Sequence, residues 1–352
     1  MTSATLPLRS RHASGLDAAS RELHALHREM LIASGEAHGH VRTSVSNLVA
    51  ACTEPDQASR AAAALLRIGA VHPARAIVIL ARPDDAKRME ADVSLHGGDA
   101  SQPTIELVRL EVGGEPSYHL TGIVAPLLIP DMPVYLWVLG APPLRQAFSA
   151  DTVELTERII VDSGAYDDSA ATLALIAGEQ HRFGDGLHLA DLAWERTAPW
   201  REMTAQAFDP VGSRPFLRDI TTLTVRCAGE RASTEAWLLA GWMASRLSWP
   251  ASGWPRVDVA ADGAQAEDDA GALIEVRVEA ARDGRTATVH GRRGGDCLHT
   301  SVAIEDAASQ RTVSLRQQDD ATLISRLMAD ATDASIYAAA VASAVDLSRR
   351  AA

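Results

Sequence analysis

The stretch from Val41 to Ala81 constrains the fold more than any other part of the chain. Residues 41–52 alternate β-branched residues and predict a strand, residues 56–72 are rich in alanine and leucine and predict a helix, and residues 74–81 predict a short buried strand. Strand, helix and strand in this order form a βαβ unit, because parallel strands need a crossover connection of helical length. This part of the chain therefore predicts a parallel sheet covered by helices.

The same rhythm continues to about residue 210. Residues 89–96 and 104–112 predict two closely spaced strands, which we expect to form an antiparallel excursion at the sheet edge. The elements expected after them are a helix at 120–129, a strand at 133–139, a short helix at 153–158, a strand at 158–163, a helix at 169–180, an extended segment at 187–194 and a helix at 199–208. We therefore predict an α/β fold whose N-terminal domain is three-layered and Rossmann-like, with a mostly parallel sheet.

The second half has a different pattern. Asp209-Pro210, with Gly212 and Pro215, predicts a linker. The strands expected beyond it are at 217–227, 272–280, 285–291, 298–306 and 311–317; helices are expected at 233–247, from Ala321 and from Asp333, and the acidic stretch 260–271 is expected to be a loop. Strands in series with helices before and after them predict an α+β domain with an antiparallel sheet and flanking helices.

These patterns predict three segments. Residues 1–40 form an N-terminal tail and helix, residues 41–210 the α/β domain and residues 216–352 the α+β domain. The N-terminal helix carries a single apolar seam, made by Leu16, Ala19, Leu23, Leu26 and Met30.

Charge and cysteine content exclude several classes of protein. The chain has 46 acidic and 33 basic residues and a net charge of −13, which argues against nucleic acid or an anionic membrane surface as a partner. Its longest apolar run, residues 236–244, is far shorter than the roughly 20 residues of a membrane span. Cys52, Cys227 and Cys297 form no CxxC pair, which fits a reducing compartment. No signal-peptide pattern is present, so we expect a cytoplasmic protein.

No motif of a cofactor-dependent enzyme is present. Neither the G-x-G-x-x-G pattern nor the phosphate loop occurs, and the first βα turn, "ACTEPDQ", contains no glycine, so a nucleotide cofactor is not expected. His24 and His27 could share a helix face with Glu36, His38 and His40 nearby, but solvent-facing histidines explain this spacing better than a metal site.

Nucleophile patterns are equally weak. Cys297 and His299 alternate on one strand without an orienting third group. The residues therefore offer no convincing active site, and we expect no catalytic residue, no cofactor and no metal.

Tryptophan is concentrated in one region. Six of the seven tryptophans lie between residues 194 and 254, although aromatic residues make up only 4% of the chain. Tryptophan and arginine are enriched at binding hot spots, and two Trp–Arg combinations occur close together. The candidate partner-binding residues are Trp194, Arg196, Trp200 and Arg201. Burial in the core or between domains remains an alternative for them.

Several of these segments resemble the glucose-6-phosphate dehydrogenase assembly protein family, OpcA. The segments are "NLVA" and "HPARAIVIL" in the first βαβ unit, "VAPLLIPDMPVYLWVLG" at 124–140, "DLAWERTAPWREMTAQAFD" at 191–209 and "LLAGWMASRLSW" at 238–249. They follow one another in order from Asn47 to Trp249. The first 40 residues and the C-terminal strands match only loosely.

The resemblance implies a non-enzymatic assembly factor or allosteric activator. Such a protein binds glucose-6-phosphate dehydrogenase and promotes its active oligomeric state in the oxidative pentose phosphate pathway. The three cysteines do not match a regulatory set, so redox control is not expected.

Two alternatives remain open. The first is a sugar-phosphate-binding enzyme or metabolite sensor, with a site at the C-terminal edge of the α/β sheet that uses Asp131, Asp162 or Asp167. The second is a scaffold that self-associates through the N-terminal apolar seam.

Overall fold

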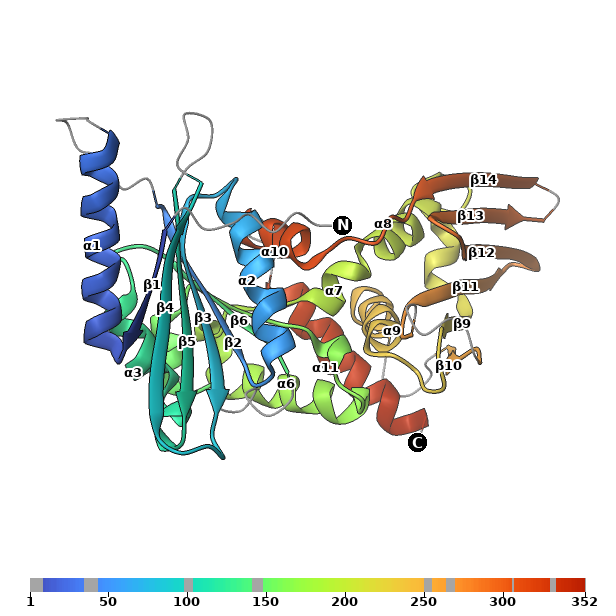
Figure 1. Cartoon of the computed structure of the whole chain (residues 1–352). Coiled ribbons are helices and arrows are strands. Elements are labelled where there is room, and N and C mark those ends of the chain that lie inside the picture. The colour runs from blue at the N-terminus through green and yellow to red at the C-terminus, as the bar shows by residue number, and fades with distance from the viewer. Residues whose placement is uncertain are drawn as a thin grey trace. The chain divides into compact units, whose positions relative to one another are not determined.

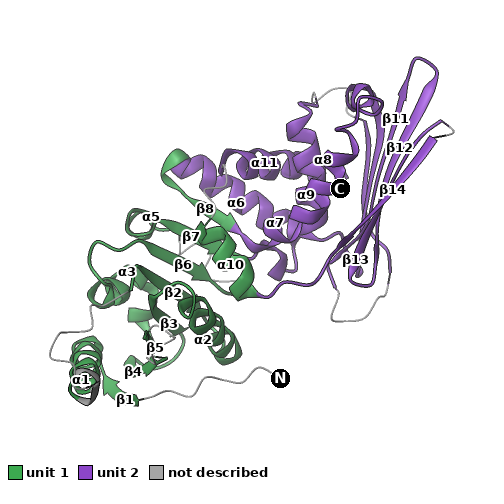
Figure 2. Ribbon diagram, turned by 90° about the horizontal axis from the view of Figure 1, so that it is seen from above, with its two compact units in different colours: residues 1–161, 185–190, 320–330 green, residues 162–184, 191–319, 331–352 purple. Residues whose placement is uncertain are grey.

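The chain forms two compact units, each built from discontinuous segments. The computed structural model describes residues 9–34, 44–97, 104–140, 148–249, 255–263, 270–305, 307–329 and 334–351. Unit 1 comprises residues 1–161, 185–190 and 320–330, and unit 2 comprises residues 162–184, 191–319 and 331–352 (Figure 2).

Unit 1 is built on an eight-stranded sheet in the order β1-β4-β5-β3-β2-β6-β7-β8. The strands are β1 (Arg9–Ser14), β2 (Ser46–Cys52), β3 (Ala74–Arg82), β4 (Arg88–His96), β5 (Ile105–Gly113), β6 (Val134–Val138), β7 (Arg158–Val161) and β8 (Leu189–Asp191). Parallel pairing joins β5, β3, β2, β6 and β7, while β4 and β1 continue the sheet antiparallel to their neighbours. The mostly parallel sheet and its antiparallel excursion are thus confirmed.

Strand β1 corrects one expectation. The first dozen residues look like a loose tail in the sequence, yet Arg9–Ser14 pairs with β4 over its whole length. Only Ala13 of this strand is a buried hydrophobic residue, and charged side chains such as Arg11 hold it in place through Glu22 on the following helix. A strand fixed by a pairing partner about eighty residues away carries little apolar signal of its own.

Helices cover both faces of the unit 1 sheet (Figure 1). They are α1 (Leu16–Ser34), α2 (Pro55–Gly69), α3 (Leu120–Val124), α5 (Ala150–Leu155) and α10 (Asp320–Ala329). Helix α2 and its neighbour α10 lie on one face, and α1, α3 and α5 lie on the other (Figure 2). The connection from β2 to β3 runs along the sheet in the opposite direction to the connections from β5 to β6 and from β6 to β7. Because such crossovers are right-handed, their helices lie on opposite faces. The seam residues Ala19, Leu23 and Leu26 are buried where α1 packs on β1 and β4. The seam is therefore used within the unit, while self-association of the chain stays a prediction.

A buried ionic cluster fastens α1 to the sheet. His27 Nε2 lies 2.6 Å from Glu106 Oε1, and Arg75 Nε donates to Glu106 Oε2 over 2.5 Å. Arg75 Nη1 also donates to the carbonyl of Leu127 over 2.6 Å. Burial alone would raise the pKa of Glu106, but the hydrogen bond from His27 and the charge of Arg75 lower it to about 2.

Replacement of Glu106 by glutamine should destabilise unit 1 by roughly 3 kcal/mol at pH 7, because it leaves the buried Arg75 guanidinium without its counter-charge. Since the folded-state pKa is lowered, this stabilisation is present above about pH 4.5 and is lost as the pH falls towards 2. In denaturant unfolding, the difference in free energy of unfolding between wild type and Glu106→Gln should therefore become smaller as the pH is lowered. Glu111→Gln is the control and should cost under about 1 kcal/mol, because Glu111, on the same strand as Glu106, forms an exposed pair with Arg88 of β4. A difference in free energy of unfolding that does not change with pH would contradict the role of the ionised Glu106 carboxylate.

Unit 2 is built on a six-stranded sheet in the order β10-β9-β11-β12-β13-β14. Its strands are β9 (Ile220–Cys227), β10 (Arg256–Ala261), β11 (Leu273–Arg282), β12 (Arg285–Gly294), β13 (Cys297–Ile304) and β14 (Ala307–Ser314). The sheet is mixed and not purely antiparallel as predicted, because β10 pairs parallel to β9 after the helix between them.

The helices of unit 2 lie on one face of this sheet (Figure 2). They are α6 (Ser169–Phe183), α7 (Leu192–Arg196), α8 (Ala198–Ala207), α9 (Thr234–Arg246) and α11 (Ala334–Ala351). Helix α9 packs on β9 and β10, α8 packs on β12 and β13, and α11 packs on α9 and α6.

The boundaries of the two compact units differ from those of the predicted domains. Residues 162–184 and 191–210, expected in the first domain, belong to unit 2 because α6, α7 and α8 pack on its helices and sheet. The expected linker lies within unit 2, where Ser213 N donates to Pro210 O in a turn that leads to a short 3₁₀ helix, Arg214–Arg218. Chain-breaking residues mark this turn and not a change of unit.

Helices α9 and α11 approach each other closely at Gly241. A Cβ added there would lie 2.3 Å from the carbonyl oxygen of Ala340 and 2.7 Å from the amide nitrogen of Ala344. The two helix backbones can meet at this distance only because Gly241 has no side chain.

Gly241→Ala should destabilise unit 2 by about 1–3 kcal/mol, since the clash with backbone atoms outweighs the better helix propensity of alanine. The matched control is Gly178→Ala in α6, where an added Cβ meets nothing within 4 Å; it should be neutral or stabilise by up to about 1 kcal/mol. Thermal unfolding measures both. Equal effects of the two substitutions would refute the close approach.

Candidate functional site

Residues 191–207, which contain Trp194 and Trp200, fold as the two short helices α7 and α8, joined at Thr197. Asp191 caps α7, its carboxylate accepting from the amide of Ala193 over 3.0 Å. The Thr197 hydroxyl donates to the carbonyl of Trp194 over 2.7 Å, and α8 begins immediately afterwards with Pro199 in its first turn. The sequence predicts an extended segment at 187–194, but the chain is extended only to Asp191, because this cap starts a helix at Leu192.

Both indoles of this segment lie inside unit 2. Trp194 is 2% exposed and its ring faces that of Tyr337 at 5.7 Å between centroids. Trp200 is 3% exposed and lies over Gly291 of β12, 3.7 Å from where a Cβ would stand. In the isolated chain the two indoles are core residues of unit 2, and their contact with a partner stays a prediction.

Arg196 is neutralised within the unit. Its guanidinium binds both oxygens of Asp162, at 2.5 and 3.1 Å, and its Nε donates to Glu235 Oε1 over 3.0 Å. Burial would lower the pKa of Arg196, but these two carboxylates raise it. Gly164 lies against this pair, since a Cβ there would be 2.6 Å from Glu235 Oε1. Asp162, one of the candidates for a sugar-phosphate site, is thus part of an internal ion pair.

The most buried carboxylate of the segment is Asp191, which the sequence pattern does not single out. It accepts from the hydroxyl and amide of Ser163, at 2.5 and 3.0 Å, and from the phenol of Tyr337 at 2.8 Å. Burial raises the pKa of Asp191, while these hydrogen bonds oppose the rise. A short polar residue directly before an apolar helix start is the one signal that could have indicated it.

In the cluster of Asp191, Ser163 and Tyr337, both hydroxyl groups donate to the Asp191 carboxylate. The Ser163 hydroxyl is bound to a carboxylate, and no imidazole is among the hydrogen-bond partners of Asp191 and Ser163 in the described chain. A serine nucleophile needs an adjacent base that can take its proton at neutral pH. The arrangement fits a structural node better than a catalytic one.

Arg201 differs from Arg196 because no carboxylate of the described residues forms an ion pair with it. Its Cζ lies 3.6 Å from the centroid of the Trp194 ring, its Nε donates to Thr197 Oγ1 over 3.0 Å and its Nη2 donates to Trp194 O over 3.4 Å. Burial lowers the pKa of Arg201 to about 10, against the opposing charge of Glu195. Arg201 is half-buried, and its Nη1, which has no hydrogen-bond acceptor in the described chain, is not among the fully buried polar atoms.

The first βα turn of unit 1 is closed to phosphate by its own side chains. Gln57 Oε1 accepts from the amides of Thr53 and Glu54, at 3.3 and 3.4 Å, and Pro55 supplies no amide hydrogen. Glu54 and Asp56 add negative charge at the start of α2. Helix N-termini bind phosphate through free amides and positive potential, and this one offers little of either.

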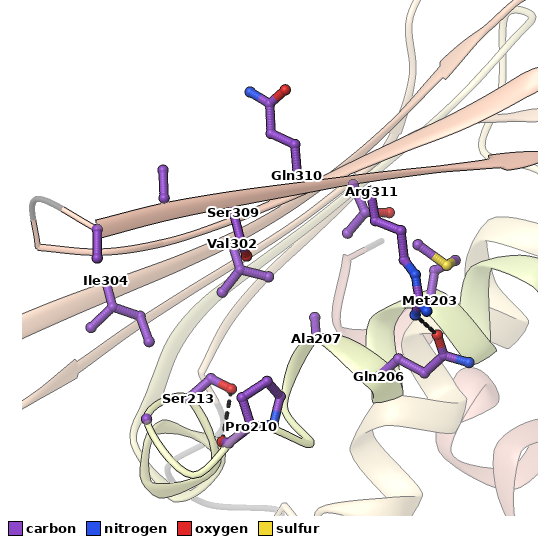
Figure 3. Close-up of a pocket in the computed structure, with 14 residues that line it drawn as sticks. Met203, Gln206, Ala207, Pro210, Ser213, Val302, Ile304, Ser309, Gln310 and Arg311 are labelled. Atoms are coloured by element: carbon purple, nitrogen blue, oxygen red, sulfur yellow. Dashed lines mark hydrogen bonds between the residues drawn. The ribbon is translucent and has the colours of Figure 1, made fainter.

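An open groove lies between α8 and the strands β13 and β14 of unit 2 (Figure 3). Its volume is about 450 Å³, and it is lined by Met203, Gln206, Ala207, Pro210, Gly212, Ser213, Thr300, Val302, Ile304, Ala307, Ala308, Ser309, Gln310 and Arg311. Arg311, which donates to Gln206, is the one ionisable residue among the described residues of this lining. Such a groove can take apolar groups but has no pair of groups for acid–base chemistry.

Histidines and cysteines form no reactive site in the described ranges. His24 bonds to Ser20 O and His27 to Glu106, while residues 36, 38 and 40 lie outside the described chain. No cluster of three metal-ligating side chains occurs among the residues with described positions. The three cysteines are free, and burial raises the pKa of Cys52 to about 12.

Other candidates have separate surroundings. His299 bonds to Thr312 and not to Cys297. Asp131 belongs to unit 1, whereas Asp167 belongs to unit 2. The described helices include none that is long and apolar enough to cross a membrane.

Solved structures of similar chain trace include an NAD binding oxidoreductase from Klebsiella pneumoniae, with a TM-score of 0.42 and 8% identity over 87% of this chain and 98% of that one. A scyllo-inositol dehydrogenase from Lactobacillus casei has a TM-score of 0.38 and 9% identity over 87% of this chain and 96% of that one. These likenesses are too low to transfer an activity.

Sequence comparison is more specific. Residues 66–178 match the family model described as glucose-6-phosphate dehydrogenase subunit N-terminal domain, and residues 187–341 match the model of the corresponding C-terminal domain. Similar curated proteins are the putative OxPP cycle protein OpcA of Synechocystis, 28% identical over 188 residues, and that of Nostoc punctiforme, 28% identical over 183 residues. The matches cover 52% and 51% of this chain, and 38% of each relative. With the two family models matched in order along the sequence, the chain belongs to the OpcA family of glucose-6-phosphate dehydrogenase assembly proteins.

Proposed function

We propose that the protein is a non-enzymatic assembly factor and allosteric activator of glucose-6-phosphate dehydrogenase. In this proposal it binds the enzyme and promotes its active oligomeric state in the oxidative pentose phosphate pathway. The observation that carries the proposal is the match of residues 66–178 and 187–341 to two models that both name this dehydrogenase.

The chemistry of the described residues supports binding over catalysis. At the first βα turn, the amides that would hold a phosphate are taken up by Gln57. The Asp191 cluster uses its donors and acceptors internally, and the groove between α8 and β14 has one ionisable lining residue. An enzyme of sugar phosphates needs charged groups free to meet its substrate.

Activation by binding requires a difference in affinity between two states of the enzyme. A partner shifts an equilibrium only as far as it binds one state better than the other. A tenfold shift needs about 1.4 kcal/mol, which a few contacts at the centre of an interface can supply.

We assign the contact to the α7–α8 segment with Trp194, Arg196, Trp200 and Arg201. The indoles are buried in the isolated chain, so their part is to fix the position of the two helices. The arginine side chains reach the surface, with 32% of the Arg196 side chain exposed. In this arrangement a rigid aromatic base carries polar groups for the partner.

The purified chain should bind the dehydrogenase of the same organism, raise its oligomeric mass in light scattering and increase its rate at subsaturating glucose 6-phosphate. The dehydrogenase mixed with heat-unfolded chain is the control, because only the folded surface can discriminate between enzyme states. NADP reduction by the isolated chain, or no binding between the two purified proteins, would refute the proposal.

A thermal-shift series separates the proposal from a metabolite sensor. Glucose 6-phosphate, 6-phosphogluconate and NADP should each leave the melting temperature of the isolated chain unchanged, because the proposal gives this chain no site for them. A ligand that did bind would add about 2.7 kcal/mol of stability at 100 times its Kd, which the assay would detect. A marked rise with any one of them would favour a sugar-phosphate or nucleotide site in this chain.

A further inference from the structure

Arg201 is a half-buried cation that no carboxylate of the described residues contacts directly. Other arginines of unit 2 meet carboxylates, as Arg196 does with Asp162 and Arg182 does with Glu179 at 3.4 Å. Within the described residues, no carboxylate oxygen lies within 4 Å of the Arg201 guanidinium, and Glu195 acts on it only at longer range. A desolvated charge without a partner is costly, so its retention needs a reason.

The guanidinium is held in one orientation. It stacks on Trp194 at 3.6 Å, and its Nε is fixed by Thr197 Oγ1 at 3.0 Å. Thr197 is itself bound to Trp194 O, and the Trp194 ring packs against Tyr337. Each layer of this support is buried, so a ligand would find the guanidinium already ordered.

The hydrogen-bond inventory leaves one edge of the guanidinium open. An arginine has five N–H donors in a planar fork. Here Nε donates to Thr197, and Nη2 donates once, to Trp194 O. No acceptor in the described chain takes a hydrogen from Nη1, so the Nη1–Nη2 edge has the donors that a carboxylate accepts in bidentate geometry.

We propose that Arg201 is the receptor for an aspartate or glutamate side chain of the partner dehydrogenase, an inference that rests on the proposed function. One guanidinium edge matches one carboxylate. A phosphate dianion has three terminal oxygens and would need further donors, whereas one carboxylate is matched by two parallel N–H groups. The flat stack on Trp194 gives the bonded pair a dry aromatic wall on one side, as at the centre of protein interfaces.

The test is the Kd of the full chain for the purified dehydrogenase of the same organism, with three variants at position 201. Arg201→Met keeps the apolar stem over Trp194 and removes the charge, and it should weaken binding about 10–100-fold. Arg201→Glu should weaken it further by repulsion. Arg201→Lys keeps a point charge without the planar fork and should fall between wild type and Arg201→Met.

The matched control is Arg182→Met. Arg182 also stacks on an aromatic ring, Phe183 at 4.7 Å, but it has Glu179 as its carboxylate, so its loss should leave Kd within about twofold. Circular dichroism and melting temperature establish that each variant is folded. In addition, an acid-to-arginine substitution in the dehydrogenase should restore binding to Arg201→Glu and to no other variant.

Three further results are decisive. If wild type binds and folded Arg201→Met and Arg201→Glu bind equally well, the inference is wrong while the proposed function stands. If wild type does not bind the dehydrogenase, the proposed function fails and the inference fails with it. A melting temperature of the isolated chain that rises with inorganic phosphate in wild type but not in Arg201→Met would overturn the inference in favour of a small-anion site.

Discussion

The packing of the helices in unit 2 depends on the hydrogen bonds that the buried carboxylate of Asp191 accepts. It accepts hydrogen bonds from Ser163, from Ala193 at the start of α7 and from Tyr337 on α11, three segments that are distant in the sequence. Tyr337 in turn packs on Trp194, over which Arg201 lies. Through these contacts a carboxylate that never reaches the surface sets the position of the Arg201 guanidinium, which no carboxylate of the described residues contacts directly.

Local patterns predicted the elements whose apolar residues repeat regularly, such as β2, α2 and β3. Strand β1 was missed because it depends on pairing with β4, and the helix expected at 120–129 ends at Val124 because Pro126 interrupts it. Strand β10 was missed as well, and with it the parallel pairing that makes the second sheet mixed. Each miss concerns a partner or a chain break that hydrophobic periodicity does not report.

The site was predicted in part for the same reason. Composition singled out the α7–α8 segment, because tryptophan is scarce in the chain and two of its seven residues lie in this segment, each followed closely by an arginine. The sequence could not show that Arg196 is neutralised by Asp162 and Glu235 while Arg201 is not, since these carboxylates come from two other segments. Folding therefore separates two arginines that look equivalent in the sequence: one completes the interior and the other keeps an open edge.

The central claim is that the chain acts by docking the α7–α8 segment onto the dehydrogenase. Amide hydrogen exchange of the full chain, with and without the enzyme, tests it most directly, because a docked surface exchanges more slowly. The account predicts added protection in peptides covering residues 192–207, with β2 and β3 of unit 1 unchanged. Unchanged exchange in 192–207 while another surface becomes protected would contradict it.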